Sequence, residues 1–381
     1  MVIGAIVLVV LIDLLFIFIP DKETSETENR SLQQAPSLSY DTFTSGRFES
    51  QFDDYVSDQF PLRDFWISLE TTIARLAGNT YSNGIFLGSD GYLIQDFTYP
   101  SEESYEKTLQ EFTSISSANP ELNIYALIAP TALSILSDKL PLNAPAGDED
   151  GYLDRLFKDL ESSGIKTIDL RERFRNIQDG SLNCAASELA GESDNFTVQL
   201  YYRTDHHWTT DGAFEAFNAF KTASSLPSSS PDYERTVVTA EFKGTLSASS
   251  GFKQSETDTI YVYLPTEETT IDYTVTNVDT GIPSASVYDT SYLETRDKYG
   301  MFLGGNHALL KIQTDAVSTK SILVIKDSYA NCFIPFLIPY YSKIIVVDPR
   351  YYLDDINELI QNENISEVLY LYNAESLAER N

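Results

Sequence analysis

Residues 322–329 read ILVIKDSY, an apolar run that stops abruptly at Lys326 and Asp327. A short continuous apolar run bounded by polar residues is typical of a strand buried on both faces. We therefore predict a strand over residues 321–326 and a helix over residues 329–340. This arrangement places Ser328 directly after the carboxyl end of a buried strand.

The same alternation of strand and helix recurs on both sides of this segment. The other predicted elements are helices near residues 105–117, 153–163 and 353–362, and strands at residues 123–129, 166–170, 343–348 and 366–372. Alternation of this kind predicts an α/β fold, in which helices cover both faces of a parallel sheet.

Residues 224–295 interrupt the alternation. They follow a predicted helix at residues 211–223, are dense in Ser and Thr, and contain three β-rich runs, at residues 236–242, 259–264 and 270–278. We interpret this segment as a β-rich insertion in the α/β core.

The N-terminal segment is apolar over residues 2–19 apart from Gly4 and Asp13. At ~1.5 Å per residue, a helix of this length just crosses a hydrocarbon core of ~30 Å. Bulky residues at positions 16–19 argue against a cleavage site, so a retained membrane anchor is predicted over residues 1–20. A cleaved signal segment is the alternative.

A polar tether and two helices are predicted between this anchor and the sheet. Apolar residues recur at helical intervals over residues 43–76 and are interrupted by Pro61. Asp90-Gly91 lies between two short apolar runs and predicts a hairpin over residues 85–94. The resulting units are residues 1–20, 21–80 and 81–381, the last with its insertion at about 224–295.

The composition excludes some classes of partner. The 381 residues include 57 acidic and 26 basic side chains, which gives a formal net charge of −31. A field of this sign repels phosphate backbones, so nucleic acid is not expected as a partner. Cys184 and Cys332 lack the spacing of a zinc site or of a disulfide framework.

The segment Tyr201–Thr209, YYRTDHHWT, holds two of the three histidines beside a carboxylate. A serine hydroxyl becomes nucleophilic when an imidazole accepts its proton, and a carboxylate must fix the tautomer of that imidazole. Because Asp205 precedes His207 by two positions, a bend would bring its carboxylate to Nδ1 and leave Nε2 facing Ser328. His206 is then free to face elsewhere.

Two other interpretations of this segment remain open. One is a metal site, for which three histidines without a Cys or Glu cluster give poor zinc spacing. The other is a loop whose role is structural only.

Four segments follow predicted strands and are expected at one edge of the sheet. They are Pro130-Thr131, Ser328, Pro349-Arg350 and Asn373. In open α/β sheets, ligands bind outside the carboxyl ends of the strands. A helix start beside Ser328 also favours the negative charge that forms when a nucleophile attacks a carbonyl. We therefore predict the active site at this edge.

The motif Thr204–Thr209, TDHHWT, resembles the signature of DHHW proteins, which are similar to the alginate O-acetyltransferase type of SGNH hydrolase-like domain on bacterial cell surfaces. Further motifs that carry the resemblance are Glu28–Arg30, Asp58–Asp64, Gly304–His307, Lys326–Asn331 and Asp348–Tyr352. These motifs span most of the chain after the predicted anchor. The resemblance implies an SGNH hydrolase-like, flavodoxin-like fold for residues 81–381.

The resemblance also implies roles for individual residues. Asp205 becomes the orienting acid, His207 the base and Ser328 the nucleophile. SGNH enzymes commonly use an asparagine after a glycine as an oxyanion donor, which implies Asn306 together with the backbone N–H of Tyr329. A plain turn is the alternative for the Asn306 segment.

Side chains near these motifs are candidates for substrate binding. Tyr202, Arg203, Trp208 and Tyr329 are predicted to form a sugar-stacking rim, with core packing as the alternative. Arg350 is predicted to hold an anionic or hydroxyl-rich substrate, with a surface salt bridge as the alternative.

The function implied is acyl transfer through an acyl-enzyme on Ser328. The chain would be a cell-surface O-acetyltransferase or acetylesterase acting on an extracytoplasmic polysaccharide, with no cofactor and no metal. The partners implied are the polysaccharide, a membrane-bound O-acyltransferase that delivers the acetyl group, and the membrane that holds the anchor. The alternative is a non-catalytic carbohydrate-binding or assembly protein of the cell envelope.

Overall fold

The structure, a computed structural model, describes residues 10–11, 14–16, 18–25, 30–189, 198–229, 231–252 and 256–380. The predicted membrane anchor at residues 2–19 lies largely outside these ranges. Within them, no helix combines the length and the apolar character needed to cross a bilayer. The anchor therefore stays a prediction.

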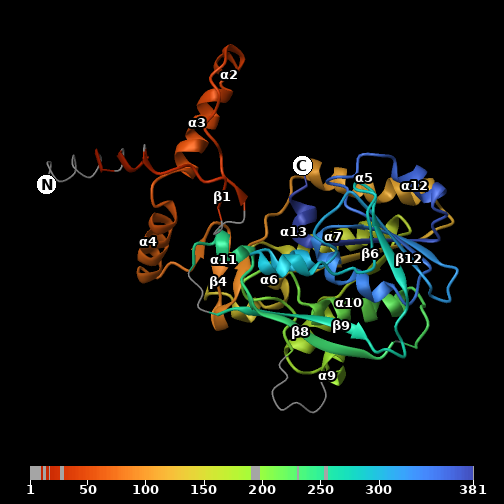
Figure 1. The fold of residues 1–381 in the computed structure, drawn as a ribbon. Helices are drawn as coiled ribbons and strands as arrows, with labels where there is room; N and C mark the ends of the chain where they lie inside the picture. Colours follow the sequence, from red (N-terminus) through yellow and green to blue (C-terminus); the bar gives the residue numbers. More distant parts are fainter. Residues whose placement is uncertain are drawn as a thin grey trace.

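An eight-stranded sheet forms the centre of the molecule, in the order β11-β10-β12-β14-β13-β15-β6-β7 (Figure 1). Its strands are β6 (Asn123–Ala129), β7 (Lys166–Ile168), β10 (Tyr273–Asn277), β11 (Pro283–Ser284), β12 (Leu309–Thr314), β13 (Ser321–Lys326), β14 (Lys343–Val347) and β15 (Glu367–Asn373). Every residue of β13 is buried, as its continuous apolar sequence predicts. The predicted bounds of β6 and β13 agree with the structure.

The sheet is mixed, not wholly parallel. β14, β13, β15, β6 and β7 run parallel, which confirms the predicted α/β class. β12 pairs with β14 in the antiparallel sense, and β10 and β11 continue the sheet beyond it. The prediction of a purely parallel sheet is therefore wrong on this side. A strand in antiparallel pairing can have one solvated face, which is why β12 carries the polar residues Lys311 and Gln313.

Helices cover both faces of the sheet. On one face, Tyr370 of β15 packs against Phe112 of α5 (Glu102–Ala118), with ring centroids 4.3 Å apart. On the other face, Tyr125 of β6 packs against Phe220 of α10 (Thr210–Ala223), at 5.5 Å. Figure 1 shows α5 and α12 (Ile356–Asn362) across the sheet from α10. The same figure shows α7 (Glu149–Ser162) and α13 (Ala374–Ala378) near α5.

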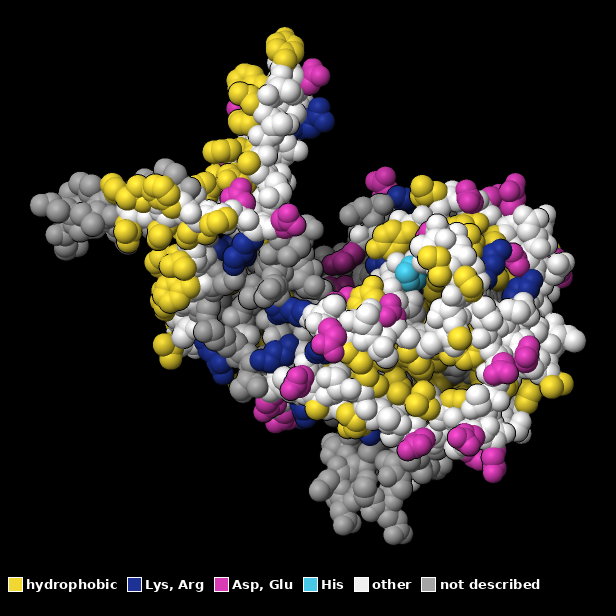
Figure 2. All heavy atoms as spheres, viewed as in Figure 1, with side chains coloured by type: hydrophobic (Ala, Val, Ile, Leu, Met, Phe, Trp, Pro, Cys, Tyr) yellow, Lys and Arg dark blue, Asp and Glu magenta, His cyan; other side chains and the backbone are white. Residues whose placement is uncertain are grey.

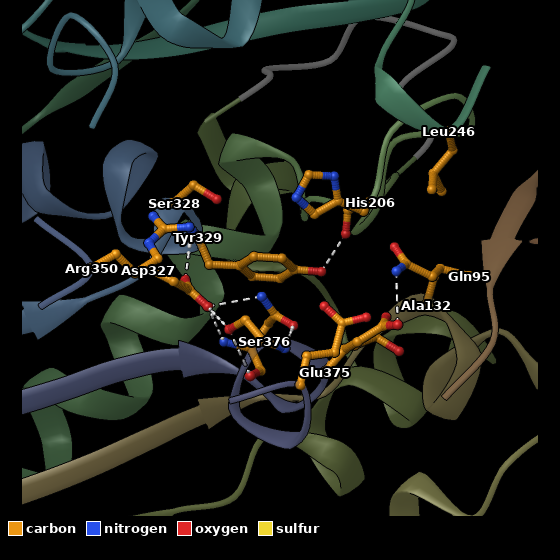
Figure 3. A pocket seen from close by; sticks show the side chains of 13 residues that line it. Gln95, Ala132, His206, Leu246, Asp327, Ser328, Tyr329, Arg350, Glu375 and Ser376 are labelled. Carbon is orange, nitrogen blue, oxygen red and sulfur yellow. Dashed lines mark hydrogen bonds between the residues drawn. The ribbon is translucent and has the colours of Figure 1, made fainter. Parts of the chain in front are cut away.

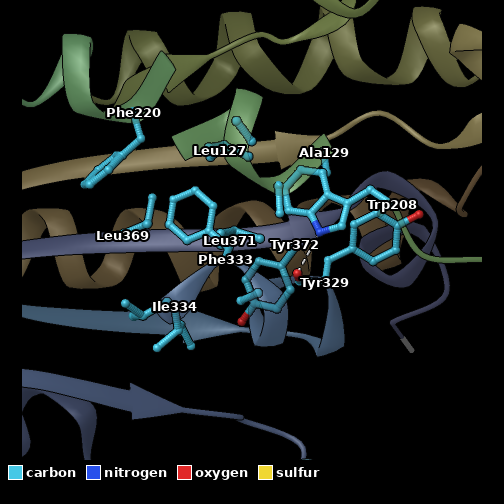
Figure 4. Close-up of a cluster of buried hydrophobic side chains, with 14 of the residues drawn as sticks. Leu127, Ala129, Trp208, Phe220, Tyr329, Phe333, Ile334, Leu369, Leu371 and Tyr372 are labelled. Atoms are coloured by element: carbon cyan, nitrogen blue, oxygen red, sulfur yellow. Dashed lines mark hydrogen bonds between the residues drawn. The ribbon is translucent and has the colours of Figure 1, made fainter. Parts of the chain in front are cut away.

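The apolar core on the α10 side of the sheet continues up to the predicted active site. Figure 4 shows Leu127 and Leu369 packed beneath Phe220 and Phe333, with Trp208 and Tyr329 at the far end of the same layer. Tyr329, the residue after Ser328, is therefore fixed by the main core.

Both cysteines are buried and free.

The predicted helix over residues 329–340 is wrong. Two short 3₁₀ turns take its place, η5 (Ser328–Cys332) and η6 (Ile334–Leu337). Pro335 and Pro339 lack the N–H that an α-helix interior requires, and their rings clash with the preceding turn.

The predicted insertion contributes to two separate sheets. β8 (Tyr233–Phe242) and β9 (Asp258–Pro265) form an antiparallel ribbon of their own. The short helix α11 (Thr245–Ser249) lies between them in the chain. β10 and β11, by contrast, belong to the central sheet.

The N-terminal helices project from the main body (Figure 1). They are α2 (Tyr40–Thr44), α3 (Arg47–Asp58) and α4 (Arg63–Leu76), with the predicted break at Pro61. No residue of α3 is buried, and Figure 2 shows apolar side chains gathered along these helices. The predicted hairpin is present as β4 (Ile85–Leu87) and β5 (Leu93–Gln95).

Candidate active site

The structure brings Asp205, His207 and Ser328 together at the carboxyl end of β13. Nε2 of His207 lies 2.7 Å from Oγ of Ser328, and its Nδ1 lies 2.6 Å from Oδ1 of Asp205. An ionised carboxylate only accepts hydrogen bonds, so Nδ1 carries the proton and Nε2 is left to accept from the serine hydroxyl. The contact between Asp205 and Nδ1 of His207 is the one predicted from their spacing of two positions.

Asp205 is buried and remains ionised. Burial alone would raise its pKa, but the imidazoles of His207 and His206 and several hydrogen bonds lower that pKa well below its ordinary value. Its Oδ2 accepts from the backbone N–H of Thr245 at 2.9 Å and lies 3.2 Å from the Thr245 hydroxyl. Gly244 allows this approach, because an added Cβ would lie 2.1 Å from Cβ of Asp205.

The loop that carries the two histidines is anchored by Asp258 at the start of β9. Its carboxylate accepts from the N–H of Arg203 at 2.9 Å and from the N–H and hydroxyl of Thr204 at 2.8 and 2.6 Å. Asp258 is itself buried. The β8–β9 ribbon therefore supports the site through Asp258 on one strand and Thr245 after the other.

Tyr299 holds both partners of the serine–histidine contact. Its ring stacks on His207, with centroids 3.9 Å apart and planes 14° apart. Its hydroxyl donates to the backbone oxygen of Ser328 at 3.2 Å. Tyr299, Thr245 and Asp258 were missed at the sequence level, because none of them belongs to a motif that signals such a contact.

His206 lies at the edge of this arrangement. Its Nδ1 is 2.9 Å from Oγ1 of Thr245, and its ring packs on His207 with centroids 3.9 Å apart. Burial, with His207 adding to the effect, lowers the pKa of His206 to about 4. The ring is therefore neutral at pH 7 and adds no positive charge beside His207.

Asp327 fixes the turn on which Ser328 stands. One oxygen accepts from the N–H of Tyr329 at 2.8 Å. The other accepts from the N–H and Nδ2 of Asn373, each at 2.8 Å, and from the hydroxyl of Ser376. This buried carboxylate joins the ends of β13 and β15 and limits the positions open to the serine.

Ser328 opens onto a cavity of about 260 Å³ (Figure 3). Thr131, Ser328, Arg350 and Asn373 all line it. The four segments expected at one edge of the sheet therefore do meet there. Glu375 also lines the cavity, although no motif pointed to it.

The two predicted oxyanion donors make other contacts in the structure. The N–H of Tyr329 is occupied by Asp327. Oδ1 of Asn306 accepts from the buried ammonium of Lys326 at 2.7 Å, and Asn306 is not among the residues that line the cavity. Asn306 instead helps to solvate Lys326, whose pKa burial lowers to about 8.

The predicted stacking rim is also largely wrong. Tyr202 and Trp208 are buried and are not among the residues that line the cavity. The indole of Trp208 donates to the backbone oxygen of Tyr329 at 2.9 Å and serves the core. Arg203 lies over the ring of Tyr92, away from the cavity lining, whereas Tyr329 does line it.

Arg350 reaches the cavity but is already paired. Its Nε and Nη2 donate to the buried carboxylate of Asp348 at 2.8 and 2.5 Å. Both the predicted place at the sheet edge and the alternative salt bridge therefore describe this side chain.

In the part of the chain that the structure describes, one group of side chains is arranged so that it could hold a metal ion. It consists of Asp205, His206 and His207. Both ring nitrogens of His207 already face partners, Asp205 and Ser328. Metal binding through His207 would require one of these contacts to break. The arrangement fits proton transfer better than ligation.

Fold and site together define an α/β protein with a serine, a histidine and an aspartate in contact at the carboxyl edge of its sheet. The model of the DHHW protein family matches residues 172–347, which confirms the resemblance. A comparison with curated protein sequences gives no match.

Solved structures share this fold. A DHHW family protein from Eubacterium siraeum is 22% identical with a TM-score of 0.60, over 78% of this chain and 93% of that one. Bacillus cereus PatB1, in a structure with a sulfonyl adduct, is 21% identical with a TM-score of 0.60, over 77% and 95%. The O-acetyltransferase domain of Pseudomonas putida AlgJ is more distant, at 15% identity and a TM-score of 0.47, over 78% and 93%.

Proposed function

We propose that this protein is an SGNH-type acyltransferase or esterase in which Ser328 is the nucleophile, His207 the base and Asp205 the orienting acid. The observation that carries the proposal is the pair of contacts made by His207, 2.7 Å to Ser328 and 2.6 Å to Asp205. These distances are within the hydrogen-bond reach that proton transfer requires.

The reaction has two steps of the same kind. In the first, the Ser328 hydroxyl gives its proton to Nε2 of His207, Oγ bonds to the acetyl carbonyl carbon, and the donor's leaving oxygen departs with that proton. In the second, an acceptor hydroxyl or water gives a proton to Nε2 and attacks the acyl carbon. Oγ of Ser328 then leaves and takes the proton back.

The negative charge on the carbonyl oxygen needs a hydrogen-bond donor close to Ser328, because the N–H of Tyr329 is already taken by Asp327. Among the described residues, no acceptor is found for the backbone N–H of Ser328, a residue that lines the cavity. We assign it as one oxyanion donor. The buried acceptors of Asp327 hold this part of the backbone in place.

The substrate class rests on the resemblance of the motifs to DHHW proteins. The sulfonyl adduct of PatB1 is the kind of product that a nucleophilic side chain forms. An extracytoplasmic polysaccharide is the proposed acceptor, and a membrane-bound O-acyltransferase is the proposed source of acetyl groups. The N-terminal segment would hold the protein at the outer side of the cell membrane.

The first prediction concerns Ser328. Incubation with 4-nitrophenyl acetate should release 4-nitrophenolate, and Ser328→Ala should lower kcat by at least about 10³-fold because the acyl-enzyme cannot form. Ser114→Ala is the matched control, since Ser114 is exposed on α5 and is not among the residues that line the cavity. Equal activity, or equal inertness, of the wild-type protein and Ser328→Ala would favour the binding-only alternative.

A further inference from the structure

Gln95 and Glu375 form a polar wall of the cavity that the acyl-transfer chemistry does not use. Glu375, the second residue of α13, is only 9% exposed and lines the cavity. Nε2 of Gln95 donates to its Oε1 at 2.7 Å. In the part of the chain that the structure describes, this is the one hydrogen bond to that carboxyl group, so Oε2 is left for a ligand.

This wall faces the nucleophile across the cavity. In Figure 3, the ring of Tyr329 lies between Ser328 and the pair formed by Gln95 and Glu375. Ser328 comes from the end of β13 and Glu375 from the end of β15, two adjacent parallel strands. A sugar bound against the wall would therefore reach toward the acyl group on Ser328.

The charges around the cavity are unfavourable for a carboxylate ligand. Asp327 and Glu379 line it, together with one basic residue among those described, Arg350. The guanidinium of Arg350 is paired with the buried carboxylate of Asp348. An incoming carboxylate would find no unpaired cation and would meet the exposed Glu379 at the rim.

The state of Glu375 suits an uncharged ligand. Burial, with Glu379 and Glu149 adding to the effect, raises the pKa of Glu375 to about 9. At neutral pH the group is then a protonated acid, which both donates and accepts hydrogen bonds. Gln95 has the same dual capacity, and sugar hydroxyl groups require it from their partners.

We propose that Gln95 and Glu375 form the acceptor subsite, and that it takes the hydroxyl groups of an uncharged sugar and excludes uronic acid polymers. This inference rests on the proposed function, because it names the acceptor of the same acyl-enzyme. The formal net charge of −31 acts in the same direction, since it repels polyanions before they reach the cavity.

The test compares two acceptors of equal length in one reaction. The full chain is given 4-nitrophenyl acetate with either cello-oligosaccharide or oligogalacturonate, and acetylated sugars are measured by mass spectrometry. The uncharged acceptor should be acetylated with a kcat/KM at least about tenfold higher than the uronate. Equal or faster acetylation of the uronate would overturn the proposal.

Substitutions of Glu375 test whether this residue carries the selectivity. Glu375→Lys should raise the ratio of uronate to uncharged acceptor by about tenfold, because it adds a cation to the wall. Glu106→Lys, on an exposed part of α5, introduces the same lysine outside the cavity and should leave the ratio unchanged. If both variants shift the ratio equally, the selectivity belongs to the whole molecule and the subsite is refuted.

A second variant covers the case in which Glu375→Lys does not fold. Glu375→Gln keeps the size and hydrogen-bonding capacity of the protonated acid, so the preference for the uncharged acceptor should stay within about threefold of wild type. Loss of that preference would contradict the subsite. Release of 4-nitrophenolate without any sugar reports the acyl-enzyme alone, so failure of the proposed function is seen separately from failure of this inference.

Discussion

At the scale of single residues, the two adjacent histidines make different contacts. His207 contacts both Ser328 and Asp205, whereas His206 contacts Thr245 and lies over the ring of His207. The predicted split, in which His207 serves the nucleophile and His206 faces elsewhere, matches these positions.

A prediction follows from this difference. His207→Ala should lower kcat for 4-nitrophenyl acetate by at least about 10³-fold, and adding Ser328→Ala should cause little further loss because the pair acts as a unit. His206→Ala should cost only about tenfold, through loss of the ring that packs on His207. Steady-state kinetics of the four proteins checks this. A larger loss from His206→Ala than from His207→Ala would exchange the two roles.

Residue patterns predicted that Asp205, His207 and Ser328 would meet, but not which groups hold them. Asp205 and His207 share a short loop, so their relation is visible in the local sequence. Tyr299, Thr245 and Asp258 reach the same loop from distant parts of the chain, and a single tyrosine, threonine or aspartate there carries no periodic or spacing signal. Such contacts exist only after the chain has folded.

At the scale of secondary structure elements, continuous apolar runs were the most predictable feature. β6 and β13 are buried on both faces and agree with their predicted bounds. The antiparallel edge was harder, because β12 alternates buried and solvated positions and resembles an ordinary surface strand. The helix after Ser328 was overpredicted, because Pro335 and Pro339 stand within the predicted range and are excluded from the interior of an α-helix.

The loop between β6 and α6 (Ala132–Ile135) depends on a buried carboxyl group. Oε1 of Glu149, in α7, accepts from the N–H of Thr131 at 2.7 Å, and Thr131 lines the cavity. Burial raises the pKa of Glu149 to about 7, although the two hydrogen bonds from Thr131 act to lower it. In the unfolded chain, Glu149 loses its carboxyl proton at the ordinary pKa of glutamate. The folded state therefore binds this proton more tightly.

The sign of the resulting pH dependence is therefore fixed. The contribution of Glu149 to stability is fully present below its ordinary pKa and is lost as the pH rises through about 7. Between about pH 5 and about pH 8, the free energy of unfolding of the wild type should fall by about 1–3 kcal/mol more than that of Glu149→Gln. Urea unfolding at both pH values measures this, with the exposed Glu106→Gln as the control. An identical pH slope in wild type and Glu149→Gln would contradict the assignment.

At the scale of the whole molecule, the main body and the N-terminal helices differ in how they are stabilised. The main body has a continuous core around the sheet. α3 contributes no buried residue, and Phe65, Ile73 and Leu76 of α4 are exposed. Apolar side chains are therefore concentrated on a segment that adds little to the core, next to the predicted membrane anchor.

Removal of residues 1–79 should consequently leave the main body intact. The transition temperature should change by less than about 2 °C, because few buried contacts are lost, and release of 4-nitrophenolate should be unchanged. The full chain should sediment with phospholipid vesicles and the shortened chain should not, because the proposed attachment lies in the removed part. A fall of more than about 5 °C would instead make the N-terminal helices part of the cooperative fold. Sedimentation of the shortened chain would move the membrane contact to the main body, where the cavity and its acidic rim lie.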